Sequence, residues 1–268
     1  MADVQEDPVP DRPAAPDSVP GTVYELGPHR LLCGDSTSAD AVKTALGGAT
    51  ADILWTDAPY GVAYQSHMAE GGTASRFRSI ENDDLEPEAL QAFLTACFTN
   101  AAASLRPGAA FYACHANQRP GIYPAFEAAL LVSGFHIGSV LVWVKPAATM
   151  GWQNYRNRYE PILYGWKKGA DRRKVEDRTE TTVWEVARDA AISYEHPTQK
   201  PVELVEAAAL RKQHRRRRGG AGLVRGIGQH PDRRCSSGPQ GCSGREGPRL
   251  LRRHPPPLGA VPGQGERP

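Results

Sequence analysis

The sequence predicts an α/β domain built on a doubly wound sheet. Short apolar runs of strand length alternate with stretches of helical periodicity over about residues 22–211. Two of the runs lead into an acidic residue, Asp35 and Asp57, as strands do when their carboxyl ends open into a pocket. No apolar stretch reaches membrane-spanning length, and the N-terminus lacks the basic and then apolar pattern of a signal peptide. We therefore expect a soluble, cytoplasmic protein.

The first predicted elements are two short strands, at residues 23–26 and 29–33, on either side of a Gly-Pro turn. A helical pattern follows and stops at a Gly-Gly pair, after which an apolar run at residues 51–55 predicts a third strand. This strand-helix-strand order indicates a βαβ unit. We therefore expect Asp35 and Asp57 to lie on the same edge of one sheet.

The chain beyond residue 60 continues the same alternation. Residues 61–83 lack periodicity and are expected to form a mobile loop over the pocket. The later elements predicted from apolar spacing are helices at residues 86–105 and 123–133 and strands at residues 109–114, 137–145 and 161–166. Strands and helices in this order favour a sheet with helices on both faces.

The six residues Thr56-Asp57-Ala58-Pro59-Tyr60-Gly61 directly follow the third predicted strand. Proline fixes its own φ and donates no hydrogen bond, so this loop keeps its shape and leaves backbone carbonyls available as acceptors. The carboxylate of Asp57, these carbonyls and the flat ring of Tyr60 suit a planar group that carries an NH2, as adenine and cytosine do. An ordinary turn, in which Asp57 caps the loop and Tyr60 packs against the core, is compatible with the same six residues.

Residues 146–195 are aromatic and basic, within a region whose net charge is otherwise negative. Such a concentration of cations and rings indicates an anionic partner such as the DNA backbone, although a solvated loop has the same composition. The basic residues that we expect to contact DNA are Arg156, Arg158, Lys167, Lys168, Arg172 and Arg173.

The turn His196-Pro197-Thr198-Gln199-Lys200-Pro201 precedes a helix predicted at residues 202–210. A rigid, proline-bracketed turn at a helix N-terminus, with the hydroxyl of Thr198 and the ammonium of Lys200, is a candidate seat for the carboxylate of a ligand. These six residues alone do not identify the ligand.

Five motifs occur in the order typical of one enzyme family. They are Gly34-Asp35, the six residues at 56–61, Trp143-Val144-Lys145, Tyr159-Glu160-Pro161-Ile162-Leu163-Tyr164-Gly165 and the turn at 196–201. In this order the chain resembles, over about residues 22–211, the β class of the amino-group DNA methyltransferases. In that class the catalytic Asp-Pro-Pro-Tyr motif precedes the target-recognition region, and the glycine loop for the cofactor comes last.

The resemblance implies a Rossmann-like, doubly wound methyltransferase sheet with permuted motif order. It also implies transfer of a methyl group from S-adenosyl-L-methionine to N6 of adenine or N4 of cytosine in double-stranded DNA, without a metal. The target-recognition region would span about residues 146–195. The residues carried over are Asp57, Ala58, Pro59 and Tyr60 for catalysis and Asp35, Asp57, Thr198 and Lys200 for cofactor binding.

Catalysis in this family positions a flipped-out base and needs no covalent intermediate. Asp57 and the carbonyl of Ala58 would accept hydrogen bonds from the target amino group, and Tyr60 would stack on the base. Ala58 stands where the family has its first proline, and alanine keeps that carbonyl. Asp57 favours adenine without excluding cytosine, and it argues against methylation of a protein glutamine. No Pro-Cys dipeptide is present, so the nucleophile loop of C5-cytosine methylation is missing.

Residues 212–268 differ in composition from the rest of the chain. They contain 13 Lys+Arg and 3 Asp+Glu, a net charge of +10, which leaves −8 for residues 1–211 out of the overall +2. This segment has no Phe, Tyr, Trp, Met, Asn or Thr, so we expect a disordered tail, as we do for the Pro- and Asp-rich residues 1–21. The family's Asp-x-Phe-x-Gly-Ser-Gly segment, whose glycines let the backbone approach the cofactor, does not occur in the chain.

A shift of reading frame near Arg211 explains the missing segment. Read one nucleotide later, the degenerate codons from Ala221 onward permit Leu-Asp-x-Phe-Gly-Gly-Ser-Gly-Ser-Thr-Leu-Ile-Ala, which resembles the family's cofactor loop and the helix after it. We therefore interpret residues 212–268 as out of frame and the sheet as incomplete at its C-terminal end. A sheet without these strands exposes edges and apolar faces, so we expect the chain as written to be poorly stable and inactive.

Two other functions are compatible with parts of the sequence. A non-catalytic DNA-binding remnant would use the Arg-rich tail. A Rossmann oxidoreductase is less favoured, because no Gly-x-Gly-x-x-Gly follows the first strand. The five cysteines show no metal-ligand spacing and are expected to be thiols in a reducing cytoplasm. The recognition sequence, the oligomeric state and the presence of a companion restriction enzyme are left open.

Overall fold

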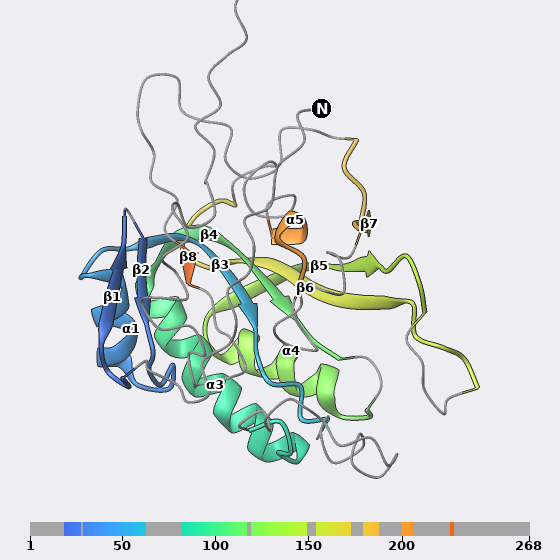
Figure 1. The fold of residues 1–268 in the computed structure, drawn as a ribbon, viewed down its shortest axis with the longest axis horizontal. Helices are drawn as coiled ribbons and strands as arrows, with labels where there is room; N and C mark the ends of the chain where they lie inside the picture. The colour runs from blue at the N-terminus through green and yellow to red at the C-terminus, as the bar shows by residue number, and fades with distance from the viewer. Residues whose placement is uncertain are drawn as a thin grey trace, which may run out of the picture.

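The described part of the chain is an α/β domain with a six-stranded mixed sheet and a separate two-stranded sheet (Figure 1). The computed structural model describes residues 19–27, 29–62, 82–116, 119–148, 154–172, 179–187, 200–205 and 226–227. The strands are β1 (Val23–Leu26), β2 (His29–Leu32), β3 (Ala51–Asp57), β4 (Leu105–Cys114), β5 (Phe135–Val144), β6 (Tyr159–Lys167), β7 (Val183–Glu185) and β8 (Gly226–Ile227). The helices are α1 (Ala39–Leu46), α3 (Pro87–Ser104), α4 (Ile122–Val132) and α5 (Val202–Val205). The fold class predicted from the sequence is confirmed.

The strand order of the large sheet is β7-β5-β6-β4-β3-β8. β3 runs parallel to β4 and β8, whereas β6 is antiparallel to both of its neighbours, β4 and β5. Because β6 runs the opposite way, its first residues lie at the same edge as the last residues of β3, β4 and β5. The pairings Asp57↔Cys114, Cys114↔Ile162 and Val144↔Tyr159 mark this edge.

Local sequence signals mark both ends of α1 and the start of α3. Ser38 caps α1, since its Oγ accepts a hydrogen bond from the Ala41 amide at 3.3 Å, and Gly47 ends the helix in a left-handed conformation with φ +60°. Pro87 occupies the first turn of α3, where a missing amide costs nothing. Leu90 and Leu94 recur at helical spacing and are fully buried, so α3 packs one apolar face on the sheet.

The two faces of the large sheet form two separate cores. Successive strand residues point to opposite faces, so Leu54 faces α3 and α4 while Ile53 and Trp55 face the other way. Figure 1 shows α3 and α4 together on one face and the short α5 on the other. The largest fully buried side chains of the α3–α4 core are Phe98, Phe111, Phe126, Phe135, Leu54, Leu90, Leu94, Leu105, Ile122 and Leu130. The opposite core contains Ile53, Ala110, Tyr112, Cys114, Leu141, Trp143, Ile162, Trp184, Val186 and Leu204.

The expected βαβ unit at the start of the domain is wrong. β2 pairs antiparallel with β1 in the two-stranded sheet, with Val23 opposite Leu32, and β3 belongs to the large sheet. Asp35 and Asp57 therefore do not follow neighbouring strands of one sheet. The sequence cannot distinguish the two arrangements, because a four-residue strand after a tight turn can pair either with its hairpin partner or with a distant strand.

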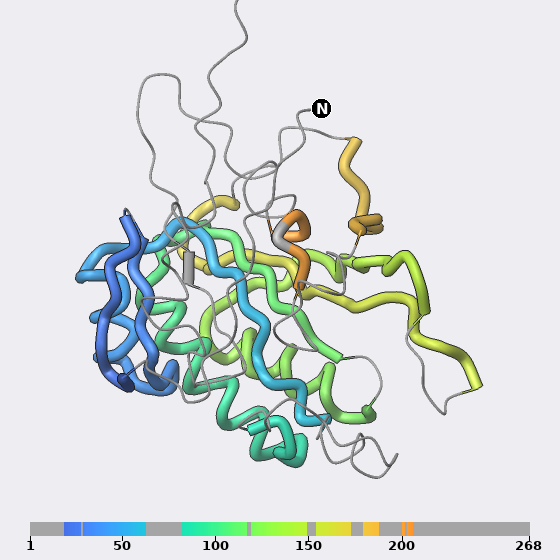
Figure 2. The backbone as a smooth tube through the Cα atoms, in the orientation of Figure 1, coloured from blue at the N-terminus to red at the C-terminus, as the bar shows by residue number. Residues whose placement is uncertain are grey.

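Several strands differ in length from the prediction. β4 begins at Leu105, so it includes the Arg-Pro-Gly segment that was expected to separate helix and strand, and its pairing with β3 shifts register there. β7 was not predicted and pairs parallel with β5. From the tail, Gly226 and Ile227 pair with Ile53 and Leu54 of β3. Figure 2 shows the described residues that flank the connection between β5 and β6, 145–148 after β5 and 154–158 before β6, extending beyond α3 and α4.

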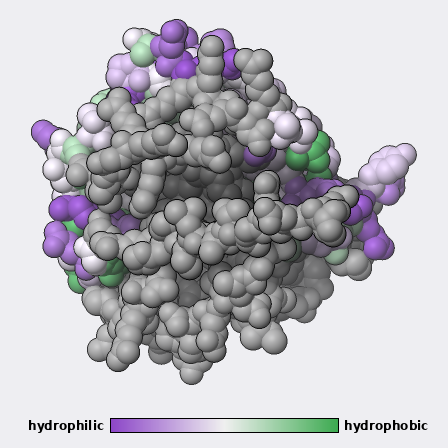
Figure 3. All heavy atoms as spheres, turned by 90° about the horizontal axis from the view of Figure 1, so that it is seen from above, coloured by the Kyte–Doolittle hydropathy of each residue, from purple (hydrophilic) through white to green (hydrophobic). Residues whose placement is uncertain are grey.

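The surface seen from above carries mostly hydrophilic side chains among its described residues, with hydrophobic ones only in small separate groups (Figure 3). Within the described part, no helix is both long and apolar enough to cross a membrane.

Candidate active site

Asp57 lies at the carboxyl end of β3, on the face opposite α3 and α4. It shares this face with Ile53 and Trp55, because it is separated from them by an even number of residues. Ala58 and Pro59, which follow it, are buried, so the chain leaves the sheet in a fixed direction. The predicted six-residue motif thus forms the end of a strand with its carboxylate held between buried neighbours.

Among the described residues, the carboxylate of Asp57 contacts Tyr60 and Lys200. The hydroxyl of Tyr60 donates to Oδ1 at 2.7 Å, and Nζ of Lys200 lies 3.0 Å from each of the two carboxylate oxygens. Lys200 also lies over the ring of Tyr60, with Nζ 5.2 Å from the ring centroid. The structure therefore brings together Asp57, Tyr60 and Lys200, three of the predicted site residues.

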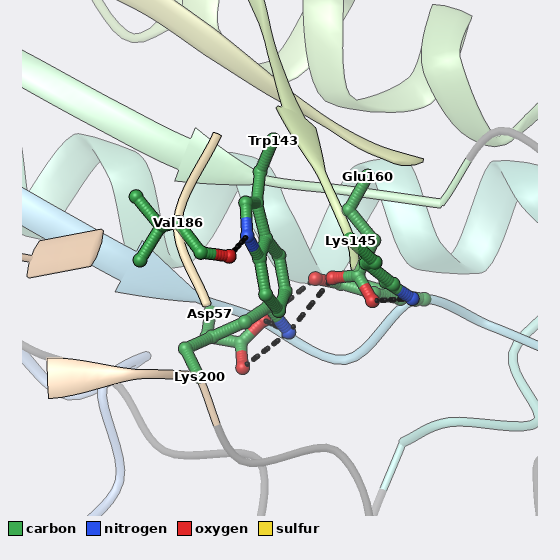
Figure 4. A network of polar contacts seen from close by, with 7 residues as sticks. Asp57, Trp143, Lys145, Glu160, Val186 and Lys200 are labelled. Atoms are coloured by element: carbon green, nitrogen blue, oxygen red, sulfur yellow. Dashed lines mark hydrogen bonds and ion pairs between the residues drawn. The ribbon is translucent and has the colours of Figure 1, made fainter. Parts of the chain in front are cut away.

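A chain of buried ion pairs extends from Asp57 into the sheet (Figure 4). Nζ of Lys200 is 3.2 Å from Oε2 of Glu160, and Oε1 of Glu160 is 2.5 Å from Nζ of Lys145. The side chains of both lysines are only 7% exposed, and those of Asp57 and Glu160 are 15% and 22% exposed. The charges alternate in sign along the chain, so each of the four largely buried groups has a partner of opposite charge.

The ion pairs shift the pKa values of their members. Burial by itself would raise the pKa of Glu160, but the ammonium groups of Lys200 and Lys145 lower it to about 2. Burial would lower the pKa of Lys200, yet the carboxylates of Asp57 and Glu160 raise it above its usual value. Both groups are therefore ionised at neutral pH. Burial, reinforced by the charge of Asp57, also raises the pKa of Tyr60, which stays a hydrogen-bond donor.

Lys145 directly follows β5, and hydrogen bonds to its backbone fix its position. Its amide donates to the carbonyl of Arg158 at 2.7 Å, and Nε of Arg158 donates to the carbonyl of Lys145 at 3.2 Å. The neighbouring Trp143 is anchored by a hydrogen bond from Nε1 to the carbonyl of Val186 at 3.0 Å (Figure 4). The cationic end of the ion-pair chain therefore sits on a rigid part of the sheet.

A second buried acid shapes the loop after Asp57. Oδ1 of Asp83 accepts hydrogen bonds from the amide of Tyr60 at 3.0 Å and from the amide of Val62 at 3.5 Å. Gly61 between them has φ +66°, and a Cβ there would lie 2.9 Å from the carbonyl oxygen of Leu85, so only glycine fits. Arg119 donates to the carbonyl of the same glycine.

Cys114 lies next to Asp57 across the β3–β4 pair and is fully buried. Burial, followed by the nearby charge of Asp57, raises the pKa of its thiol well above the usual value. The thiol stays protonated at neutral pH and cannot serve as a nucleophile.

The other predicted site residues are placed less favourably or lie outside the description. Asp35 accepts a hydrogen bond from the Thr37 amide at 2.9 Å, in the turn before α1, and that turn rests on α3 through Asn100, whose side chain donates to the Ser36 carbonyl at 3.1 Å. Thr198 and Arg173 lie outside the described residues.

The residues expected to contact DNA separate into two groups. Arg156 and Arg158 are exposed just before β6, at the same sheet edge as Asp57. Lys167 ends β6 at the opposite edge, where its Nζ donates to the carbonyl of Leu105 at 2.6 Å. Lys168 and Arg172 follow it there and are exposed, and the guanidinium of Arg172 lies 5.1 Å from the ring centroid of Trp166. The structure does not bring these residues into one patch.

Sequence reasoning missed three residues that shape the site, namely Lys145, Glu160 and Asp83. Lys145 and Glu160 belong to motifs named in the sequence analysis, but no role was predicted for them. The available signal was a basic residue at the end of one predicted strand and an acidic residue at the start of the next. Asp83 lies in a segment without periodicity, so nothing in the sequence marks it as buried.

The arrangement combines hydrogen-bond acceptors for an amino group, an aromatic ring and a buried ammonium group at one strand end. Carboxylate oxygens at that place can accept from a ligand NH2 in largely buried surroundings, where such bonds are stronger than in water. Among the described residues, no group of three or more His, Cys, Asp and Glu side chains could hold a metal ion.

Comparisons with known proteins identify the family of the chain. The model of the N6_N4_Mtase family, described as DNA methylase, matches residues 51–209, more than half of the chain. No curated protein matches. The crystal structure of an M1.HpyAVI–SAM complex is similar at 15% identity and a TM-score of 0.43, over 67% of this chain and 73% of that one.

Two further crystal structures are similar at lower scores. That of M1.HpyAVI has 14% identity and a TM-score of 0.39, over 65% of this chain and 70% of that one. That of a DNA modification methylase from Thermus thermophilus has 16% identity and a TM-score of 0.33, over 55% of this chain and 65% of that one.

Proposed function

This chain belongs to the N6/N4 DNA methylase family, and from that premise we propose that its gene encodes a site-specific DNA methyltransferase acting on adenine N6. Transfer to cytosine N4 is the alternative within the same pocket. The methyl donor is S-adenosyl-L-methionine. We further propose that the chain as written is inactive, because the glycine segment for the donor is out of frame.

One observation carries the proposal. The carboxylate of Asp57 stands at the end of β3 with Tyr60 at 2.7 Å, on a loop that Pro59 and the buried Asp83 hold in place. A capping Asp in an ordinary turn would accept from the amides that follow it. Here Asp83 accepts from those amides, so the Asp57 carboxylate is directed to side chains and ligands.

The chemistry requires only positioning by the chain's own residues. Asp57 and the carbonyl of Ala58 accept hydrogen bonds from the target NH2, which turns the nitrogen lone pair out of the ring plane toward the methyl group. With the donor bound, the nitrogen would form a bond to the methyl carbon as the carbon–sulfur bond breaks, and the nitrogen would release a proton to water. Tyr60 stacks on the base and orients it.

The described carboxylates suit the positive charge of the donor's sulfonium group, but the cation that would bind the donor's carboxylate, Lys200, already has partners. A sulfonium methyl is electrophilic and cationic, and the carboxylates of Asp57 and Glu160 lie at the sheet edge where it would react. Lys200 already contacts three carboxylate oxygens, so a donor carboxylate would have to replace one of them. Asp35 and Thr198 complete the proposed donor-binding set.

DNA binding is assigned first to Arg156 and Arg158. They are exposed at the sheet edge that holds Asp57, on the segment that extends beyond the helices (Figure 2). Guanidinium groups at this position can contact phosphates on either side of a flipped base. Lys167, Lys168, Arg172 and Arg173 are proposed to contact more distant phosphates.

The test compares the 268-residue chain with a protein in which the reading frame is restored after Arg211. Both are incubated with S-adenosylmethionine and unmethylated, amplified genomic DNA, which contains every short site, and the nucleosides are analysed by mass spectrometry. We expect N6-methyladenine from the restored protein only. Micromolar donor affinity of the 268-residue chain would overturn the proposed inactivity, and N4-methylcytosine would reverse the choice of base.

The catalytic assignment is tested in the restored protein by Asp57→Ala. We expect a loss of methylation of at least about 100-fold, because both positioning and acceptance of the amino group are lost. Methylation that survives this change would show that Asp57 is not catalytic.

A non-catalytic DNA-binding remnant is the second candidate, favoured by the net charge of +10 on residues 212–268. It predicts sequence-indifferent DNA binding that weakens steeply with salt and disappears when the tail is deleted. Binding that survives the deletion would exclude it.

A further inference from the structure

Lys200 is shared between two carboxylates. Its Nζ lies 3.0 Å from both oxygens of Asp57 and 3.2 Å from Oε2 of Glu160, and its side chain is almost completely buried. A buried ammonium that contacts two carboxylates still has a partner of opposite charge if it moves away from one of them. Glu160 is the second carboxylate that the described residues place against it.

This sharing bears directly on the acceptor role of Asp57. In the structure both of its oxygens face Lys200, and Oδ1 also accepts from Tyr60. Tyr60 and Lys200 together occupy both lone pairs of Oδ1, so a target amino group can donate to this oxygen only if the ammonium moves away from it. Moving a buried charge away without another partner is strongly unfavourable.

Glu160 is itself fixed in place. It lies at the start of β6, paired with Trp143 of β5, and its other oxygen is 2.5 Å from Lys145. Lys145 is fixed in turn by its backbone hydrogen bonds with Arg158. Lys200, by contrast, comes from the segment before the short helix α5.

We propose that Glu160, held by Lys145, is a positioning residue that takes over the ammonium of Lys200 when Asp57 accepts the amino group of the target base. The inference rests on the proposed function, because it assumes that Asp57 receives an exocyclic amino group. Glu160 does not touch the base and acts through Lys200.

The first measurement uses the full chain and needs no methylation. Lysine side chains are labelled with 13C and 15N, and the Lys200 ammonium signal is identified by its loss in Lys200→Met. We expect this signal to move in Glu160→Gln and to move again, in wild type, when adenosine is added. Inosine carries oxygen in place of the amino group and should leave the signal unchanged.

The second measurement is the affinity for adenosine. Loss of the alternative partner should weaken binding about tenfold in Glu160→Gln, the effect of one charge-assisted hydrogen bond. Because this variant leaves two buried cations with one anion, the charge-balanced double variant Glu160→Gln/Lys145→Met is measured beside it and should show the same loss. Asp52→Asn removes the ion pair to Arg106 at the other end of β3 and should bind as wild type does.

The outcomes separate this inference from the function on which it rests. Adenosine binding that falls in Asp57→Asn but not in either Glu160 variant overturns the role of Glu160 and leaves the proposed function standing. If the protein with the restored reading frame binds neither adenosine nor S-adenosylmethionine, the proposed function itself is overturned. A Lys200 signal that is identical in wild type and Glu160→Gln also overturns the inference.

Discussion

One face of the six-stranded sheet is packed by α3 and α4 with apolar side chains, whereas the other combines Trp and Tyr rings with four largely buried ionised groups. The first face contains Phe98, Phe111 and Phe126 at 1% exposure or less and has no buried ion pair among its described members. The second contains Trp143 and Tyr112 and ends in Asp57, Lys200, Glu160 and Lys145.

The difference indicates that the two faces of the sheet have different roles. Apolar packing stabilises in proportion to the area removed from water and depends little on pH. Buried ion pairs contribute little net stability but fix the geometry of a polar site and are costly to break. Stability is therefore expected from the helix-covered face and chemistry from the other.

The largest effect should come from the apolar face. Phe126→Ala removes a fully buried ring from α4 and should lower the free energy of unfolding by about 4 kcal/mol. The matched control is Leu131→Ala on the same helix, because Leu131 is 45% exposed. Urea denaturation measures both. Equal losses in the two variants would contradict the assignment of the core to this face.

Lys200→Met tests the charged face and should have the next largest effect. It leaves the carboxylates of Asp57 and Glu160 without their shared cation, and we expect a loss of about 3 kcal/mol at neutral pH. Lys43→Met, at an exposed position of α1, serves as control. A stability equal to wild type would mean that Lys200 is not buried between the two acids in solution.

Acid should weaken the charged face selectively. The pKa of Glu160 is lowered from its usual 4.5 to about 2, so its contribution is fully present above pH 4.5 and is lost as the pH falls toward 2. We expect about 2 kcal/mol from this residue over that window, after a discount for its partial exposure. The Glu160→Gln variant should lose this part of the pH dependence, as seen by denaturation at each pH. An unchanged slope would show that Glu160 titrates normally.

The smallest effect is expected for an ion pair that belongs to neither core. Asp52 and Arg106 pair at the start of β3 and β4, with side chains 20% and 39% exposed. Asp52→Asn should cost about 0.5 kcal/mol, because solvent screens the pair. If Asp52→Asn lowered the free energy of unfolding as much as Lys200→Met, the expected difference between solvent-screened and buried ion pairs would be wrong.

The sequence was sufficient for most elements of the fold. Period, caps and breakers are local signals, and they placed α1, α3, α4 and the strands β1 to β6 within a few residues, whereas β7 and β8 were not predicted. The six-residue motif at Asp57 and the motif order were also enough to indicate the family that the family model matches over residues 51–209. The prediction failed at β2, where the sequence does not show which strand it pairs with, and at β7, which is too short to show a periodic pattern.

What the sequence by itself determined was therefore the kind of elements, the strand-end position of Asp57 and the abrupt change of composition after Arg211. Only the tertiary structure decided that β6 inserts antiparallel between β4 and β5, which brings Glu160 to the edge that holds Asp57. It also decided that Lys200, 143 residues further along the chain, contacts that carboxylate. The physical reason is that local patterns depend on neighbours in sequence, whereas charge pairing in a buried site depends on which strands meet.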